Sequence, residues 1–94
     1  MTVRHLTLVH ARAGQADALG RCLQDLLAPT LRLPGCVRFE IARLAEDPQC
    51  WRIEGSWRSA TDLQAYFADP LLARVFDRAL AEGCLDRLDC RGPF

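Results

Sequence analysis

The chain has 94 residues, half of them apolar, and its 12 basic and 12 acidic side chains cancel. This size and composition predict one soluble globular domain, residues 1–94, whose small core a partner subunit would help to complete. The zero net charge argues against nucleic-acid binding, and no apolar run reaches the roughly 20 residues that cross a membrane. Because the first residues are polar and typical of a strand, we expect no signal peptide and a cytoplasmic location.

The first half of the chain predicts a strand followed by an amphipathic helix. Residues 3–11 are rich in strand formers, with Leu6 and Leu8 on one face and His5, Thr7 and Val9 on the other. Apolar residues then recur at three- and four-residue steps from Gln15 to Leu31, the spacing of one helix face. Pro34 and the glycine after it end this helix.

The second half predicts a hairpin, a helix in two segments and a last strand. Residues 36–44 and 50–57 alternate between apolar and polar, and a polar turn at 46–48 joins them. Ser59, with an aspartate three residues later, resembles a capping box at a helix start, and Asp69-Pro70 restarts the helix. Gly83 ends the helix, and residues 84–90 are expected to form an edge strand.

The order of elements, βαββαβ, predicts an α+β, ferredoxin-like domain: one antiparallel sheet with both helices on a single face. The other sheet face is expected either to lie in water or to pair with the same face of a second copy, enclosing a polar cavity. From the alternation along the strands, that face is expected to carry His5, Thr7, Arg38, Glu40, Arg52 and Glu54.

Five cysteines occur without any Cys-x-x-Cys pair, and only two histidines accompany them. This spacing does not predict a zinc site, so no metal is expected. Reduced and mostly buried thiols are typical of a cytoplasmic protein. The cysteines are Cys22, Cys36, Cys50, Cys84 and Cys90.

Short motifs follow one another in a characteristic order: Ala13-Gly14-Gln15, Pro34-Gly35-Cys36, Asp47-Pro48, Trp57-Arg58-Ser59 and Ala68-Asp69-Pro70. In this order and spacing, the chain from about Val3 to Leu80 resembles the antibiotic biosynthesis monooxygenase family of dimeric α+β barrel proteins. The resemblance implies a homodimer whose sheets form a barrel, with a small-molecule pocket between sheet and helices in each subunit. It also implies oxidation of phenols, anthrones or quinols by molecular oxygen, with no metal, flavin or other cofactor.

The sequence departs from the family pattern at three positions. Tyr66, nine residues after Trp57, and Leu71 stand where many relatives have histidine. Haem-degrading members use a histidine ligand in this helix, so the resemblance argues against haem. Gly55 stands where relatives often have glutamate, and a bulge at this glycine would re-aim Glu54 or Trp57.

The catalytic candidates are Trp57, Tyr66 and His5. Trp57 is expected to line an aromatic pocket or, alternatively, to plug the core. Tyr66 is expected to donate its phenol to a substrate oxygen or to pack within the helix face. His5 has the intrinsic pKa of a general base, but near the chain start it is alternatively a solvated residue.

The substrate-binding candidates are Arg38, Glu40, Arg52, Glu54 and Thr7. Opposite charges on the neighbouring strands either pair as a structural network at the dimer interface, or an arginine stabilises a phenolate or enolate. The predicted function is a cofactor-independent monooxygenase acting on a small aromatic, phenolic or quinol-type substrate. The alternatives are a non-catalytic small-molecule-binding or stress-associated dimer, and a proton-transfer isomerase or lyase that uses His5 or Glu54.

Overall fold

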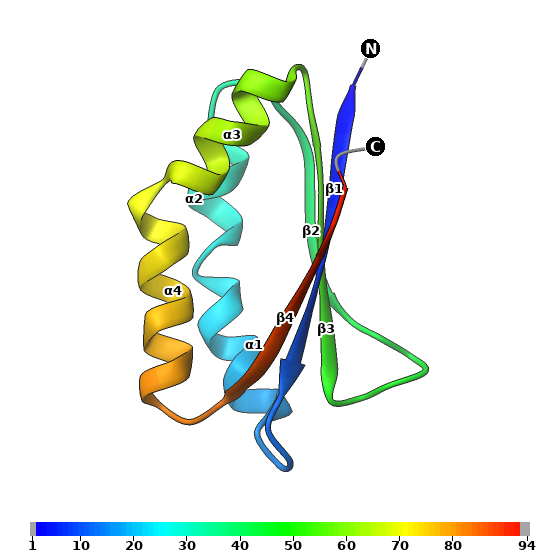
Figure 1. Cartoon of the computed structure of the whole chain (residues 1–94), viewed down its shortest axis with the longest axis vertical. Coiled ribbons are helices and arrows are strands. Elements are labelled where there is room, and N and C mark those ends of the chain that lie inside the picture. The colour runs from blue at the N-terminus through cyan, green and yellow to red at the C-terminus, as the bar shows by residue number, and fades with distance from the viewer. Residues whose placement is uncertain (1, 93–94) are drawn as a thin grey trace.

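The computed structural model describes residues 2–92 and contains a four-stranded antiparallel sheet with its helices on one face (Figure 1). The strands lie side by side in the order β2-β3-β1-β4. This is the predicted ferredoxin-like α+β arrangement. The strands are β1 (Val3–Ala11), β2 (Cys36–Arg43), β3 (Cys50–Trp57) and β4 (Leu85–Arg91), and the helices are α1 (Ala16–Gln24), α2 (Leu27–Leu31), α3 (Ala60–Ala68) and α4 (Pro70–Ala81).

The helical layer differs from the prediction at one point. The single helix expected from Gln15 to Leu31 is divided into α1 and α2. Pro29 explains the division, because it has no N–H to donate to the carbonyl of Asp25 and its ring crowds that carbonyl. The interruption predicted at Asp69-Pro70 is confirmed: Asp69 ends α3 and caps α4, with its carboxylate accepting the N–H of Leu71 at 2.8 Å. None of the helices within residues 2–92 is long and apolar enough to span a membrane.

Strand β1 packs against the helices with the face that the sequence analysis expected to be open. His5, Thr7 and Val9 are buried beneath the helical layer, while Leu6 and Leu8 are half-buried on the open face. The expectation that His5 and Thr7 share a face with the charged residues of β2 and β3 is therefore wrong. Pairing with β3 decides the orientation, because Leu6 lies opposite Glu54 and Leu8 opposite Arg52, whose side chains occupy the open face.

Gly55 lies in a regular part of the sheet. The pairing of β1 with β3 continues through it without a shift, and the irregularity falls instead in β2, between Cys36 and Arg38. Val37, at that irregularity, is 54% exposed. Because β3 keeps its alternation, Trp57 points into the core between sheet and helices and Glu54 points to the open face.

Candidate functional site

Five rings meet where the sheet passes beneath α3, and we call them the aromatic cluster: His5 from β1, Phe39 from β2, Trp57 from β3, and Tyr66 and Phe67 from α3. Tyr66 is central, with its ring centroid 5.1 Å from those of both His5 and Trp57. These separations fall in the range of favourable aromatic pairs. The structure thus brings together the three residues predicted as catalytic. Phe39 and Phe67 are not among the site residues predicted from the sequence, where nothing distinguishes them from other apolar residues of a strand and a helix.

Gly55 makes room for the cluster. Its position in β3 lies directly opposite His5 in β1. A methyl group at Gly55 would lie 2.6 Å from Cε1 of His5 and 3.0 Å from Nε1 of Trp57. Since real side chains do not approach so closely, the absence of a side chain at Gly55 lets the imidazole lie over the strand and reach the indole.

A buried hydrogen bond fixes the protonation pattern of His5. The indole Nε1–H of Trp57 donates to Nδ1 of His5 at 3.2 Å. Nδ1 is therefore an acceptor, so the proton of the neutral imidazole is on Nε2. Nε2 is buried and has no hydrogen-bond partner among residues 2–92. His5 thus presents an unused N–H donor inside the aromatic cluster.

Burial keeps both polar rings of the cluster neutral. Desolvation lowers the pKa of His5 to about 4, although the nearby Glu54 carboxylate opposes the change. Burial also raises the pKa of Tyr66 well above its usual value. At neutral pH both side chains are uncharged hydrogen-bond donors, so His5 does not have the pKa of a general base that the sequence suggested.

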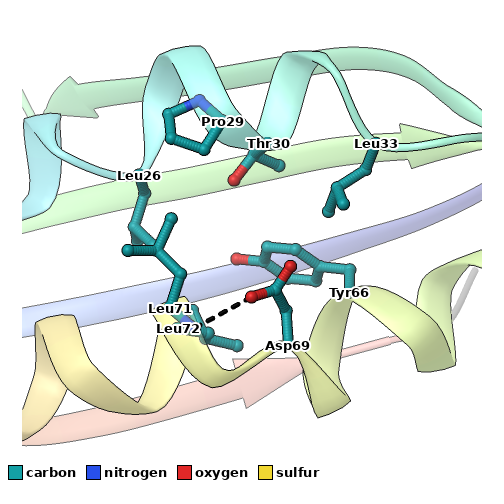
Figure 2. A pocket seen from close by; sticks show the side chains of 8 residues that line it. All are labelled: Leu26, Pro29, Thr30, Leu33, Tyr66, Asp69, Leu71 and Leu72. Carbon is teal, nitrogen blue, oxygen red and sulfur yellow. Dashed lines mark hydrogen bonds between the residues drawn. The ribbon is translucent and has the colours of Figure 1, made fainter.

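The cavity beside the cluster is small. It lies between α2, Tyr66 and the start of α4, and Figure 2 shows Tyr66 and Thr30 facing each other across it. Its volume of about 10 Å³ is enough for a single water molecule. Trp57 is 0% exposed, so a ligand beside it needs space that only a movement of side chains creates.

Phe67 is the member of the cluster that faces solvent. It is 47% exposed, and its ring centroid lies 5.4 Å from that of His5 and 5.2 Å from that of Tyr66. The other four rings are buried. Phe67 is therefore the ring through which the aromatic cluster meets solvent.

The four charged candidates lie together on the open face. They line a hollow of about 420 Å³ with Arg4 at its edge. Arg38 pairs with Glu40 at 2.6 Å and Arg52 pairs with Glu54, so the ion pairs run along each strand and not across the strands as expected. Across the strands Glu40 lies opposite Glu54.

The site residues predicted from sequence therefore divide between two faces of the sheet. Trp57, Tyr66, His5 and Thr7 lie beneath the helices, and the charged residues lie on the far side. Thr7 is outside the aromatic cluster, where its hydroxyl donates to Sγ of Cys90 at 3.7 Å. The buried side offers neutral hydrogen-bond donors in an apolar surrounding. The open side offers paired acidic and basic side chains.

The family model described as antibiotic biosynthesis monooxygenase matches residues 2–78. The chain belongs to the antibiotic biosynthesis monooxygenase family. Membership in this family supports a monooxygenase-like function. The matched residues include all five rings of the aromatic cluster and end before β4. No curated protein sequence matches the chain significantly.

Solved structures share the fold. PA3566 from Pseudomonas aeruginosa is 23% identical, with a TM-score of 0.83 over 96% of this chain and 89% of its own. A proposed antibiotic biosynthesis monooxygenase from Nitrosomonas europaea is 16% identical, with a TM-score of 0.84 over 96% and 86%. Another from Deinococcus radiodurans is 19% identical, with a TM-score of 0.80 over 100% and 93%. At these identities the likeness establishes the fold alone.

Proposed function

We propose that this protein is a cofactor-independent monooxygenase that holds a small aromatic, phenolic or quinol-type substrate against the aromatic cluster while molecular oxygen attacks it. The observation that carries the proposal is the unused Nε2–H donor of His5, buried among aromatic rings and held in place by Trp57. A buried donor without a partner costs about 1–3 kcal/mol, so a ligand oxygen at this position would recover a lost interaction.

The cluster suits an ionised aromatic substrate. His5 and Tyr66 are neutral donors, and a phenolate or enolate oxygen accepts hydrogen bonds more strongly than the neutral group from which it forms. Donors fixed in an apolar surrounding therefore stabilise the substrate anion more than its protonated form. The surrounding rings of Phe39 and Trp57 offer flat apolar walls and exclude water from the anion.

The reaction balances with oxygen as the oxidant. For an anthrone, the methylene group loses a proton to solvent, and the resulting enolate is held by the two donors. Oxygen adds to that carbon, a carbonyl group forms there, and one oxygen atom leaves as water: anthrone + O₂ → quinone + H₂O. His5 does not act as the base in this scheme, because its Nδ1 already accepts from Trp57.

Substrate entry requires Phe67 to move. The half-exposed ring of Phe67 covers His5 and Tyr66, and the cavity beside them holds only a water molecule. In the proposal the substrate ring takes the place of the Phe67 ring. The charged hollow on the open face is then assigned to a homodimer interface and not to the substrate.

Oxygen uptake by the purified protein tests the proposal. Anthrones, hydroquinones and polyphenols are supplied in turn without added metal, and quinone absorbance is followed in parallel. We expect protein-dependent uptake with one quinone formed per oxygen consumed. Trp57→Phe and His5→Phe should lower kcat by about 100-fold or more, in the range that loss of an oxyanion donor costs. Arg38→Gln, on the open face, is the matched control and should retain activity.

A binding protein without catalysis is the second candidate. The close packing around the fully buried Trp57 and the residues Tyr66 and Leu71 in place of the family's histidines favour it. This candidate predicts that a phenol quenches Trp57 fluorescence while no oxygen is consumed. Uptake unchanged in His5→Phe and Trp57→Phe would contradict the proposed site even if the protein were an oxygenase.

A further inference from the structure

Two buried thiols and a carboxylate meet at the end of the helical layer farthest from α3, where α1 and the end of α4 lie together (Figure 1). The sulfur atoms of Cys22 and Cys84 and a carboxylate oxygen of Glu82 all lie within 4.8 Å of one another. The thiol of Cys22 donates to Oε2 of Glu82 at 3.0 Å. Both cysteines are 2% exposed.

The end of α4 fixes the position of Cys84. Gly83 has a φ of 72°, a left-handed conformation that favours glycine. Its N–H donates to the carbonyl of Leu80 at 3.1 Å, and the N–H of Cys84 donates to that of Ala79 at 3.0 Å. These two bonds form a Schellman motif, which closes the helix and turns Cys84 back toward α1. The carbonyl of Cys84 also accepts the N–H of Arg12 at 2.9 Å, so the backbone on both sides is held.

We propose that Cys22, Glu82 and Cys84 form a binding site for a thiophilic divalent cation, with Zn²⁺ as the natural occupant. Zn²⁺ is bound in proteins by thiolate sulfur and carboxylate oxygen, usually in tetrahedral geometry. A Zn–S bond of about 2.3 Å places two sulfurs about 3.8 Å apart, which small side-chain rotations reach from the observed arrangement. A hollow of about 190 Å³ opens in front of the three groups and leaves room for a water as fourth ligand.

The surrounding charges suit a bound dication. Two thiolates and one carboxylate carry three negative charges. A divalent cation neutralises two of them, so one negative charge remains. Arg78 lies 3.5 Å from Glu82, and its guanidinium also pairs with Asp25 at 3.0 Å, which keeps it beside the site. Arg21 lines the same hollow. These guanidinium groups offset the remaining charge and orient the carboxylate of Glu82 from outside, as partners of metal ligands commonly do.

The bound cation would have to displace thiol protons. Burial and the neighbouring Glu82 raise the pKa of Cys22 to about 11, so its thiol is protonated at neutral pH. Metal binding therefore releases protons and strengthens as the pH rises. Because the ligands come from α1 and from both sides of the α4–β4 turn, the metal would also tie these elements together and stabilise the folded state.

Cobalt titration of the reduced, metal-free protein is the test. We expect a thiolate-to-cobalt charge-transfer band with strong visible d–d bands of tetrahedral geometry, saturating at one Co²⁺ per chain and displaced by Zn²⁺. Cys22→Ser and Cys84→Ser should abolish these bands. Glu82→Gln keeps both thiols and should weaken binding by more than the roughly 10- to 100-fold that loss of an outer partner costs. Zn²⁺ should also raise the Tm of the wild-type protein and not that of Cys84→Ser.

A second cluster in the chain provides the control. His10, Asp47 and Cys50 also lie within 4.8 Å of one another, but this cluster offers one sulfur where the first offers two. Cys50→Ser should leave the cobalt spectrum unchanged. Loss of the spectrum in Cys50→Ser, its survival in Cys84→Ser, or no cobalt bands at a large excess of metal would each overturn the proposal.

Discussion

His5 combines three properties that rarely coincide in one side chain. It is buried, one of its nitrogens accepts from Trp57, and the other carries a proton with no partner among residues 2–92. The bond from Trp57 uses only one ring nitrogen of His5, so pairing the buried indole N–H does not account for the second, unpaired N–H of the imidazole. The cost of the unused donor therefore favours a role that the folded chain by itself does not fulfil.

The stability of the protein should depend on pH through His5. Its pKa is lowered from 6.5 to about 4 in the folded state, so between these values the unfolded chain binds a proton that the folded chain does not. Stability is therefore complete above about pH 6.5 and falls as the pH drops toward 4, by roughly 3 kcal/mol over the whole interval. Urea unfolding at pH values from 4 to 7 measures this loss.

His5→Asn removes the titrating ring and should remove most of the acid sensitivity, whereas His10→Asn should retain it. An identical pH profile for the wild type and His5→Asn would show that another group causes the effect. The measured quantity is the change in the free energy of unfolding with pH. A general loss of stability in His5→Asn therefore does not obscure the contribution of the histidine.

Gly55 should tolerate no side chain while His5 occupies its present position. Gly55→Ala places a methyl group 2.6 Å from Cε1 of His5, and we expect overpacking of about 1–3 kcal/mol in urea unfolding. The same substitution in a His5→Ala background should cost clearly less, because the imidazole that it meets is gone. Equal costs in the two backgrounds would mean that the strand backbone, and not the ring contact, sets the requirement for glycine.

Among the secondary-structure elements, those with local signals were predicted correctly. The bounds of β1 and β3 agree with the alternation of the sequence, and the interruption at Asp69-Pro70 follows from capping and proline geometry. The break between α1 and α2 was missed although Pro29 is present in the sequence, because the apolar repeat continues across it. The apolar repeat predicted one continuous helix there, whereas the missing N–H and the ring of Pro29 disfavour one, and the structure follows the proline.

Features that depend on distant residues could not be predicted. Both faces of β1 carry apolar residues, so only its pairing with β3 determines that His5 lies beneath the helices. The hydrogen bond between His5 and Trp57 joins residues 52 positions apart. Sequence reasoning chose His5, Trp57 and Tyr66 one at a time, each for its own chemistry, and their contact is a result of the fold.

The cap at Asp69 should contribute measurably to the helical layer that covers the aromatic cluster. Asp69→Ala removes the acceptor of the Leu71 N–H, and we expect a loss of about 1 kcal/mol in thermal or urea unfolding. Asp77→Ala, an exposed aspartate further along α4, is the matched control and should change stability by less than about 0.5 kcal/mol. Equal effects of the two substitutions would assign the loss to charge and not to the cap.

At the scale of the whole molecule, the two faces of the sheet differ in what packs against them. The helices lie against one face, while the other has no covering element within the described residues 2–92 (Figure 1). That open face carries Leu6 and Leu8 at its centre and the charged hollow beside them. Acidic and basic side chains in one hollow make the surface complementary to a copy of itself, as a two-fold interface requires.

We therefore predict a homodimer formed through the open face, measurable by light scattering of the eluting protein. Leu8→Asp places a charge at the centre of this face, where a buried and unpaired carboxylate is strongly unfavourable, and should convert the dimer into monomers. Leu80→Asp makes the same change on α4, at a leucine that is 58% exposed, and should leave the dimer intact. A monomeric wild-type protein at high concentration, or dissociation by Leu80→Asp and not by Leu8→Asp, would place the interface elsewhere. Because His5 and the other buried rings lie on the opposite side of the sheet, the Leu8→Asp monomer also shows whether the aromatic cluster binds its ligand without a partner.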